Sequence, residues 1–260
     1  MNAAARRQLL VRGLQVAVIA AFVGAWQVLV QTGALDRFYY SSPSLIIPRI
    51  AEWLRDSSTY RDIGITLLET VLGFAIGTLL GLALGYAFAR NELLGSAFDP
   101  LFSMFNAIPR LVLAPVFVLA FGFGIASKVA LGVTLVFFIV FFATFTAVRD
   151  VDQTLVDNVR VLGARRRDIT FQVLLPAAFS AIVASLRTSA GFAFAGAVVA
   201  EYIGSTEGMG RRIANAEAFF DSTGVFGGIV IIAFLALGLD ALFQVVEARF
   251  SRWKPRRETS

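Results

Sequence analysis

The chain of 260 residues contains no cysteine and no histidine. Without cysteine it forms no disulfide and offers neither a thiol nucleophile nor a thiolate ligand for a metal. Without histidine it lacks the commonest general base and the commonest metal ligand of proteins. An intramembrane metalloenzyme or a proton relay built on histidine is therefore excluded, and we expect no metal site.

Charged residues are also scarce, at 16% of the chain, whereas 57% of the residues are hydrophobic. The mean hydropathy is +0.74, and a single soluble core of this length cannot hide that much apolar surface. We therefore predict an all-α integral membrane protein. The net charge of +5 does not indicate nucleic acid, because the basic residues are spread over loops and do not gather on one face.

Six stretches are long and apolar enough to cross a bilayer as helices, which takes roughly 20 residues each. They cover residues 14–31, 64–89, 100–121, 128–148, 181–203 and 225–246. The first has no small-x-small cleavage site and is interpreted as a retained anchor helix.

The expected division of the chain follows from these stretches. We expect an N-terminal anchor and outer interfacial segment at 1–63, a core transmembrane domain at 64–248 with a cytoplasmic loop at 149–180, and a basic tail at 249–260. Fifteen arginines and lysines fall on the side of the N-terminus, and seven, Lys128 among them, on the other. The positive-inside rule then places both termini and the 149–180 loop in the cytoplasm.

The second stretch carries regularly spaced glycines. Gly73, Gly77, Gly81 and Gly85 recur every four residues and therefore share one helix face. Small residues on one face allow another helix to approach closely. The pattern predicts helix packing there and does not identify the partner helix.

The third stretch contains prolines and a cation. Pro109 and Pro115 each remove a backbone donor, which predicts a kinked or broken helix. Arg110 is costly inside a span unless it is paired or lines a pathway, and broken segments commonly hold substrate in transporters. Two interpretations stay open. Asn106, Pro109 and Arg110 line a translocation pathway for an anionic solute, or Arg110 pairs internally with an acid such as Glu69.

Two more acids lie in apolar surroundings. Glu201, at the outer end of the fifth stretch, is interpreted either as a pathway residue near an outer gate or as an acid at the membrane interface. Asp240 in the last stretch is expected to make a structural ion pair or a helix contact.

A charged, amphipathic segment, DNVRVLGARRRDITFQVLLP, occupies residues 157–176. Its apolar spacing predicts a short helix at 152–160, a turn at Gly163, and a second helix that ends near Pro176. Three arginines from Arg165 mark a side that faces water. The segment is thus either a hairpin kept for a soluble partner or a plain solvated loop.

The spacing of Asp157, Gly163 and Leu175-Pro176 resembles the EAA loop of permease subunits of ATP-binding-cassette (ABC) importers, Glu-Ala-Ala, three residues, Gly, nine residues, Ile-x-Leu-Pro. Asp157 replaces the family's Glu, Asn158-Val159 replace its two alanines, and Val173 replaces Ile. The segments IPRLVLAPVFVLAFGFG, AGAVVAEYIGSTEGMGRRI and GLDALFQVVEARFSRW are similar to the nitrate, sulfonate, taurine and bicarbonate branch of these permeases.

This resemblance implies a type I importer permease fold with about six spans in a bacterial inner membrane. It implies a second permease copy, two cytoplasmic ATPase subunits, a periplasmic or lipid-anchored solute-binding protein, and a small anionic solute. The residues expected to couple the permease to the ATPase are Asp157, Gly163, Ala164, Arg165, Leu175 and Pro176, with Asp157 capping a helix or pairing with a cation of the ATPase. Substrate identity, and homodimer against heterodimer, stay open.

The chain has no Gly-x-x-x-x-Gly-Lys-Ser/Thr sequence, so it carries no phosphate-binding loop of that type. We therefore expect no cofactor and no catalytic residue in this chain, and ATP with magnesium in the partner ATPase.

Two other classes of protein compete with this interpretation. An ion-coupled secondary transporter with Arg110 and Glu201 as coupling residues leaves the 157–176 segment without a purpose. A membrane-embedded enzyme using Glu69, Glu201 or Asp240 lacks histidine, cysteine and clustered carboxylates of helical spacing within a span.

Overall fold

The computed structural model describes residues 3–250, and this part of the chain consists of helices joined by short connections, without a strand. The predicted tail at 249–260 lies almost entirely outside the described residues. The helices are α1 (Ala3–Gln31), α2 (Arg37–Tyr40), α3 (Pro43–Trp53), α4 (Ser57–Ala89), α5 (Glu92–Ala107), η1 (Arg110–Leu113), α6 (Ala114–Phe121), α7 (Ile125–Arg149), α8 (Gln153–Val161), α9 (Arg166–Ile169), η2 (Thr170–Leu174), α10 (Leu175–Ile203), α11 (Met209–Ala218) and α12 (Ser222–Phe250).

Five helical segments of the described chain are long and apolar enough to cross a membrane. They are Arg6–Gln31, Ser57–Ala89, Ile125–Arg149, Arg167–Ile203 and Ser222–Val245. Each contains one of the predicted stretches almost completely, so the prediction of an all-α membrane protein is confirmed.

The third predicted stretch, 100–121, is not a single span. Helix α5 ends at Ala107, Ile108 and Pro109 are extended with ψ of 125° and 94°, and the chain resumes as η1 and the eight-residue α6. Pro109 has no N–H to continue α5, and Pro115 stands in the first turn of α6, where a missing N–H costs nothing. The predicted break of the helix near Pro109 is therefore present. The prediction that residues 100–121 form one span is wrong.

The chain divides into two compact units. The first contains the residues up to Tyr60 together with Arg212–Ile232, and the second contains Arg61–Arg211 together with the residues from Ala233 onward.

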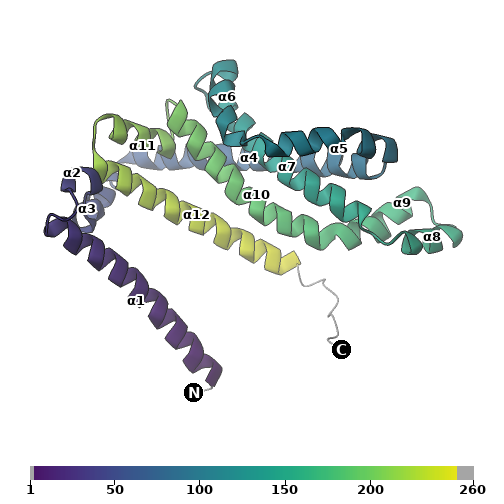
Figure 1. Cartoon of the computed structure of the whole chain (residues 1–260), viewed down its shortest axis with the longest axis horizontal. Helices are drawn as coiled ribbons and strands as arrows, with labels where there is room; N and C mark the ends of the chain where they lie inside the picture. The colour runs from purple at the N-terminus through teal and green to yellow at the C-terminus, as the bar shows by residue number, and fades with distance from the viewer. Residues whose placement is uncertain (1–2, 251–260) are drawn as a thin grey trace. The chain divides into compact units, whose positions relative to one another are not determined.

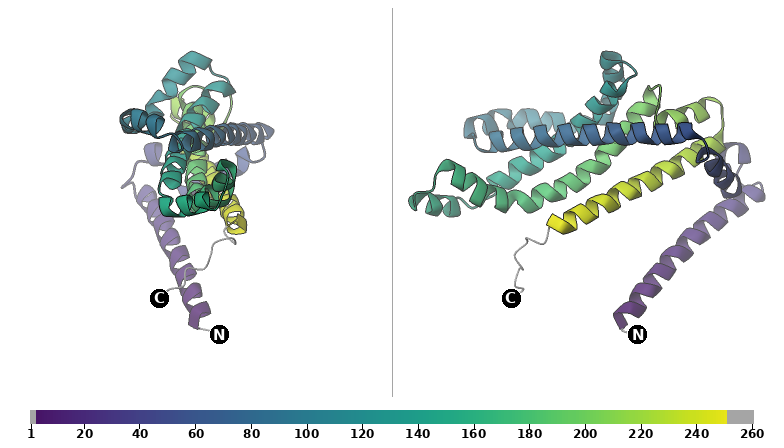
Figure 2. Two further views of the ribbon diagram at one scale, coloured as in Figure 1. Left: turned by 90° about the vertical axis from the view of Figure 1, so that its right-hand side faces the viewer. Right: turned by 180° about the vertical axis from the view of Figure 1, so that it is seen from behind.

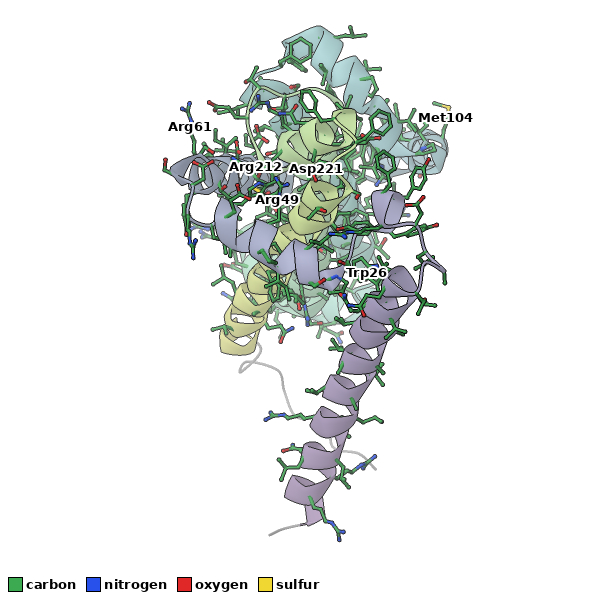
Figure 3. The ribbon with its side chains drawn as sticks, turned by 90° about the vertical axis from the view of Figure 1, so that its left-hand side faces the viewer. Trp26, Arg49, Arg61, Met104, Arg212 and Asp221 are labelled. Carbon is green, nitrogen blue, oxygen red and sulfur yellow. The ribbon has the colours of Figure 1, made fainter. Side chains whose placement is uncertain are left out.

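The first unit is held by contacts between its N-terminal segment and the 212–232 segment. The Arg49 guanidinium lies 3.4 Å from a carboxylate oxygen of Asp221 (Figure 3). The Arg212 guanidinium lies 5.2 Å from the centre of the Trp53 ring. Next to them, the hydroxyl and amide of Ser58 donate to Asp56 and hold the pKa of that carboxyl below its usual value. These surface contacts join segments that are far apart in the sequence.

The second unit is built around α7, against which α4, α6 and α10 pack (Figures 1 and 2). The four regularly spaced glycines of α4 are buried and lie against α7. A Cβ added at Gly77 would stand 2.7 Å from Val136 Cβ, and one added at Gly85 would stand 2.7 Å from the Phe141 carbonyl oxygen. The helix that the sequence left unidentified is therefore α7.

Candidate functional site

The amphipathic segment forms a helical hairpin beside the ends of α7 and α10 (Figure 2). Helix α8 begins after Asp152, whose side chain accepts a 2.8 Å hydrogen bond from the Thr154 amide. One expectation was that Asp157 caps a helix, and this is wrong. Asp157 lies inside α8 and forms a 2.8 Å ion pair with Arg160. The Asp157 carboxylate is exposed, and the residue that caps α8 is Asp152.

The turn of the hairpin is at Gly163, whose φ is +89°. In this left-handed conformation a residue with a Cβ is strained, whereas glycine adopts it freely. The turn is closed by a hydrogen bond from the Ala164 amide to the Val159 carbonyl, 3.2 Å, and by one from the Arg165 amide to the Asp168 carboxylate, 3.0 Å. The predicted turn residue is thus the one that the backbone requires.

The second helix of the hairpin does not end near Pro176, so that prediction is wrong. Helix α9 leads into the π-helical turn η2 and then directly into α10, so that residues 167–203 form one long helix. A proline ring clashes with the carbonyl four residues earlier in a regular α-helix. The wider π turn directly before Leu175-Pro176 gives the ring room and lets the helix continue.

The hairpin is anchored by its apolar side and exposes apolar residues at its tip. Val156, Ile169 and Leu174 are at most 2% exposed and belong to one hydrophobic cluster with the end of α7 and the start of α10. Val161 and Leu162, directly before Gly163, are in contrast 87% and 85% exposed. Both side chains are therefore free of contact with the core and available to a partner.

The break in the third segment places Arg110 in a hollow. The side chains of Pro109, Arg110, Leu135, Ile139, Thr188 and Phe192 line a cavity of about 320 Å³ between η1, α7 and α10. The Arg110 guanidinium lies 4.6 Å from the centre of the Phe138 ring, at the distance of a cation–π contact. Asn106 belongs to α5, and its side chain lies outside the described part of the chain.

Glu201 is fully buried inside the protein, so it is not a solvated acid at the end of α10. One carboxylate oxygen accepts a 2.7 Å hydrogen bond from the Thr66 hydroxyl, and the other accepts a 2.7 Å bond from the Gly210 amide. The amides of Met209 and Gly208 donate to the Thr66 hydroxyl and to the Asp62 carboxylate, at 3.0 and 2.9 Å. Three successive amides of this turn are thus bound to side chains of α4 and α10.

Glycine is required in this turn for two reasons. Gly208 has φ +106°, and a Cβ added there would stand 2.2 Å from the Glu201 carboxyl carbon. A Cβ at Gly210 would likewise stand 2.2 Å from the Val198 carbonyl oxygen and 2.8 Å from Glu201 Cβ, so glycine allows the close approach of this turn to α10. The Gly-Met-Gly sequence thus completes a buried site for the two acids.

Lys128 is the cation of the same cluster. The sequence places it among the seven basic residues expected outside the membrane, on the side away from the N-terminus. It is fully buried, and its ammonium donates 2.6 Å hydrogen bonds to the carbonyls of Phe123 and Gly204. It also interacts electrostatically with Glu69 and Glu201, whose side chains lie next to each other. We use the name buried polar cluster for Asp62, Thr66, Glu69, Lys128 and Glu201.

Sequence reasoning missed three members of this cluster, Asp62, Thr66 and Lys128. A signal was present for two of them, because Asp62, Thr66 and Glu69 follow each other at four and three residues and therefore share one helix face. Asp240 behaves as expected, since the Arg187 guanidinium lies 3.1 Å from its carboxylate. The described residues contain no group of three or more acids, histidines or cysteines that could hold a metal ion.

Comparisons with known proteins agree with this architecture. Residues 73–252 match the family described as "Binding-protein-dependent transport system inner membrane component". A Bacillus subtilis (strain 168) protein provisionally named an aliphatic sulfonates transport permease is 32% identical over 235 residues, which cover 90% of this chain and 85% of the relative. The taurine transport system permease of Escherichia coli (strain K12) is 24% identical over 245 residues, which cover 92% of this chain and 89% of the relative.

The fold is also found in a solved structure. An inward-facing structure of the MetNI methionine ABC transporter superposes with a TM-score of 0.62 at 19% identity, covering 74% of this chain and 94% of the matched chain. This likeness supports the fold. The family match begins within α4 and covers α7, the hairpin, α10 and α12 completely. The chain belongs to the family of inner membrane components of binding-protein-dependent transport systems, the permease subunits of ABC importers.

Proposed function

We propose that this permease works with two copies of a separate ATPase, which bind the hairpin α8–α9. The exposed pair Val161 and Leu162, held at a turn that only glycine adopts freely, is the observation that carries this proposal. The apolar base of the hairpin ties it to α7 and α10, so that a movement of the ATPase is passed to the spanning helices. In this arrangement ATP and magnesium belong to the partner.

We propose further that the solute is a small anion that passes Arg110. The hollow beside Arg110 is mostly apolar and offers one cation, which suits a compact ligand with one negative group. Two of the similar permeases are named for sulfonates and taurine, both of which carry a sulfonate anion. A solute-binding protein would deliver the solute from the far side of a bacterial inner membrane, to a permease dimer with both termini in the cytoplasm.

Replacing Gly163 by valine is expected to reduce co-purification of the ATPase with the permease by about tenfold. A β-branched residue is strained at φ +89°, so the turn changes shape and the pair Val161 and Leu162 is displaced from its contact. The measurement is the ATPase retained per permease after affinity purification of the full chain.

The matched control is Gly33→Val. Gly33 also has a positive φ, +76°, and open space around it, but lies far from the hairpin in the sequence. We expect this variant to retain the ATPase, and Leu162→Ser to lose part of it. Equal retention by Gly163→Val and Gly33→Val would contradict the proposed contact.

Replacing Arg110 by glutamine is expected to lower uptake of methanesulfonate by about 10- to 150-fold, because one charge-assisted hydrogen bond is worth roughly 1.5–3 kcal/mol. The permease is reconstituted in proteoliposomes with its ATPase and binding protein, and uptake and retained ATPase are measured together. Arg110→Lys keeps the charge and is expected to retain much of the uptake. Unchanged uptake by Arg110→Gln would remove Arg110 from the pathway.

A further inference from the structure

A second cavity, of about 850 Å³, lies at the base of the hairpin. It is lined by the end of α4, the start of α5, the end of α7 and the inner side of the hairpin. Three arginines from three elements, Arg90, Arg149 and Arg160, contribute to its wall. It shares no lining residue with the hollow beside Arg110, and its three arginines have no role in the proposed function.

The charge of this cavity is positive. Among the described residues that line it there is no carboxylate. Arg160 is paired with Asp157, but both side chains are about 60% exposed, so the pair is screened by water and contributes little. The Arg149 guanidinium lies 5.1 Å from the centre of the Phe145 ring, which orients it without neutralising its charge. The cavity therefore attracts an anion.

Most of the other lining residues are apolar, among them Phe88, Val148 and Leu174, and Asn91 adds a polar side chain. The cavity thus combines cationic and apolar residues, at the ends of two membrane-spanning helices. Guanidinium groups bind phosphate through paired hydrogen bonds, and basic pockets between spanning helices bind anionic lipid head groups. A soluble anion would use the arginines alone, whereas a phospholipid uses both kinds of wall.

We propose that this cavity is a binding site for the phosphate-bearing head group of an anionic phospholipid, held by Arg90, Arg149 and Arg160. The lipid would join the ends of α4 and α7 to α8 and so brace the hairpin against the core. The site faces the cytoplasmic leaflet if the orientation given under the proposed function is correct. The head-group chemistry itself does not depend on that orientation.

The test compares the full chain with the double variant Arg90→Gln and Arg149→Gln, each in nanodiscs of phosphatidylcholine with increasing phosphatidylglycerol. We expect bound phosphatidylglycerol, counted by native mass spectrometry, to show roughly 30-fold weaker apparent affinity in the variant, since each basic residue near a surface is worth about 1 kcal/mol. The matched control removes two exposed arginines elsewhere, Arg37→Gln and Arg55→Gln, and is expected to keep the affinity.

Three outcomes would overturn the proposal. Equal affinities of the double variant and the control show that the cavity does not select the lipid. Equal protection from thermal unfolding by glycerol phosphate or inorganic phosphate assigns the cavity to a soluble anion. Loss of ATPase co-purification in the double variant with unchanged lipid binding assigns these arginines to the ATPase contact. The last result would leave the Gly163→Val experiment, and with it the proposed function, intact.

Discussion

Replacing Lys128 by methionine is expected to lower the free energy of unfolding of this permease by about 2–6 kcal/mol, because two buried carbonyls lose their donor and each unsatisfied group costs roughly 1–3 kcal/mol. The change leaves the carbonyls of Phe123 and Gly204 without their 2.6 Å donor and leaves Glu69 and Glu201 without a buried counter-charge. Unfolding by denaturant in mixed micelles measures the effect. The variant should also release the Gly204 end of the 204–210 turn.

A second substitution separates the electrostatic part of this loss from the part that comes from the unpaired carbonyls. Glu69→Gln in the Lys128→Met background removes one of the two carboxylates and is expected to restore at least about 1 kcal/mol, since contacting residues are not additive. Arg55→Met deletes an exposed charge and serves as the control, with an expected change within about 0.5 kcal/mol. If Lys128→Met were as stable as Arg55→Met, the buried polar cluster would contribute nothing to the fold.

Adding side chains to the glycine face of α4 is expected to produce the second large effect. Gly77→Val and Gly81→Val should each cost about 1–3 kcal/mol, the range of overpacked cores. Added Cβ atoms at these positions would stand 2.7 and 2.8 Å from Val136 Cβ and Val140 Cβ on α7. The two helices must therefore separate, or the α7 side chains must leave their rotamers. Thermal unfolding in detergent measures the loss.

The same helix provides the control. Gly64 belongs to α4, and a Cβ added there meets nothing within 4 Å. Gly64→Ala should leave stability unchanged or raise it slightly, because alanine favours the helix by about 1 kcal/mol over glycine. A similar loss in Gly64→Ala and Gly77→Val would contradict the assignment of the loss to contact with α7, because only the Cβ at residue 77 meets that helix.

Some features of the hairpin were predictable from the local sequence, and others were not. Asp152 and Gly163 fix the beginning and the end of α8 through a side-chain cap and a left-handed turn, and both depend on neighbours within a few residues. The end of the second helix was not predictable in this way. Whether Pro176 stops a helix depends on whether the preceding turn widens to a π turn, and the cluster around Leu174 decides that.

The break at Pro109 was predictable for the same local reason, since proline supplies no N–H to continue the helix. The surroundings of Arg110 were not predictable. The cation–π contact with Phe138 joins residues 28 positions apart, and it exists because η1 packs against α7.

By itself, the sequence determined that this is a helical membrane protein, where five of its spans lie, where the hairpin turns, and that this hairpin resembles that of importer permeases. These properties depend on composition and on short spacings. Only the tertiary structure decided that Lys128 is a buried donor to Gly204, that Glu201 binds the amide of Gly210, and that the glycine face of α4 meets α7. An acid or a lysine at the end of a span is tolerated either in water or in a fully paired interior. The choice between them is made by packing with residues far away in the chain.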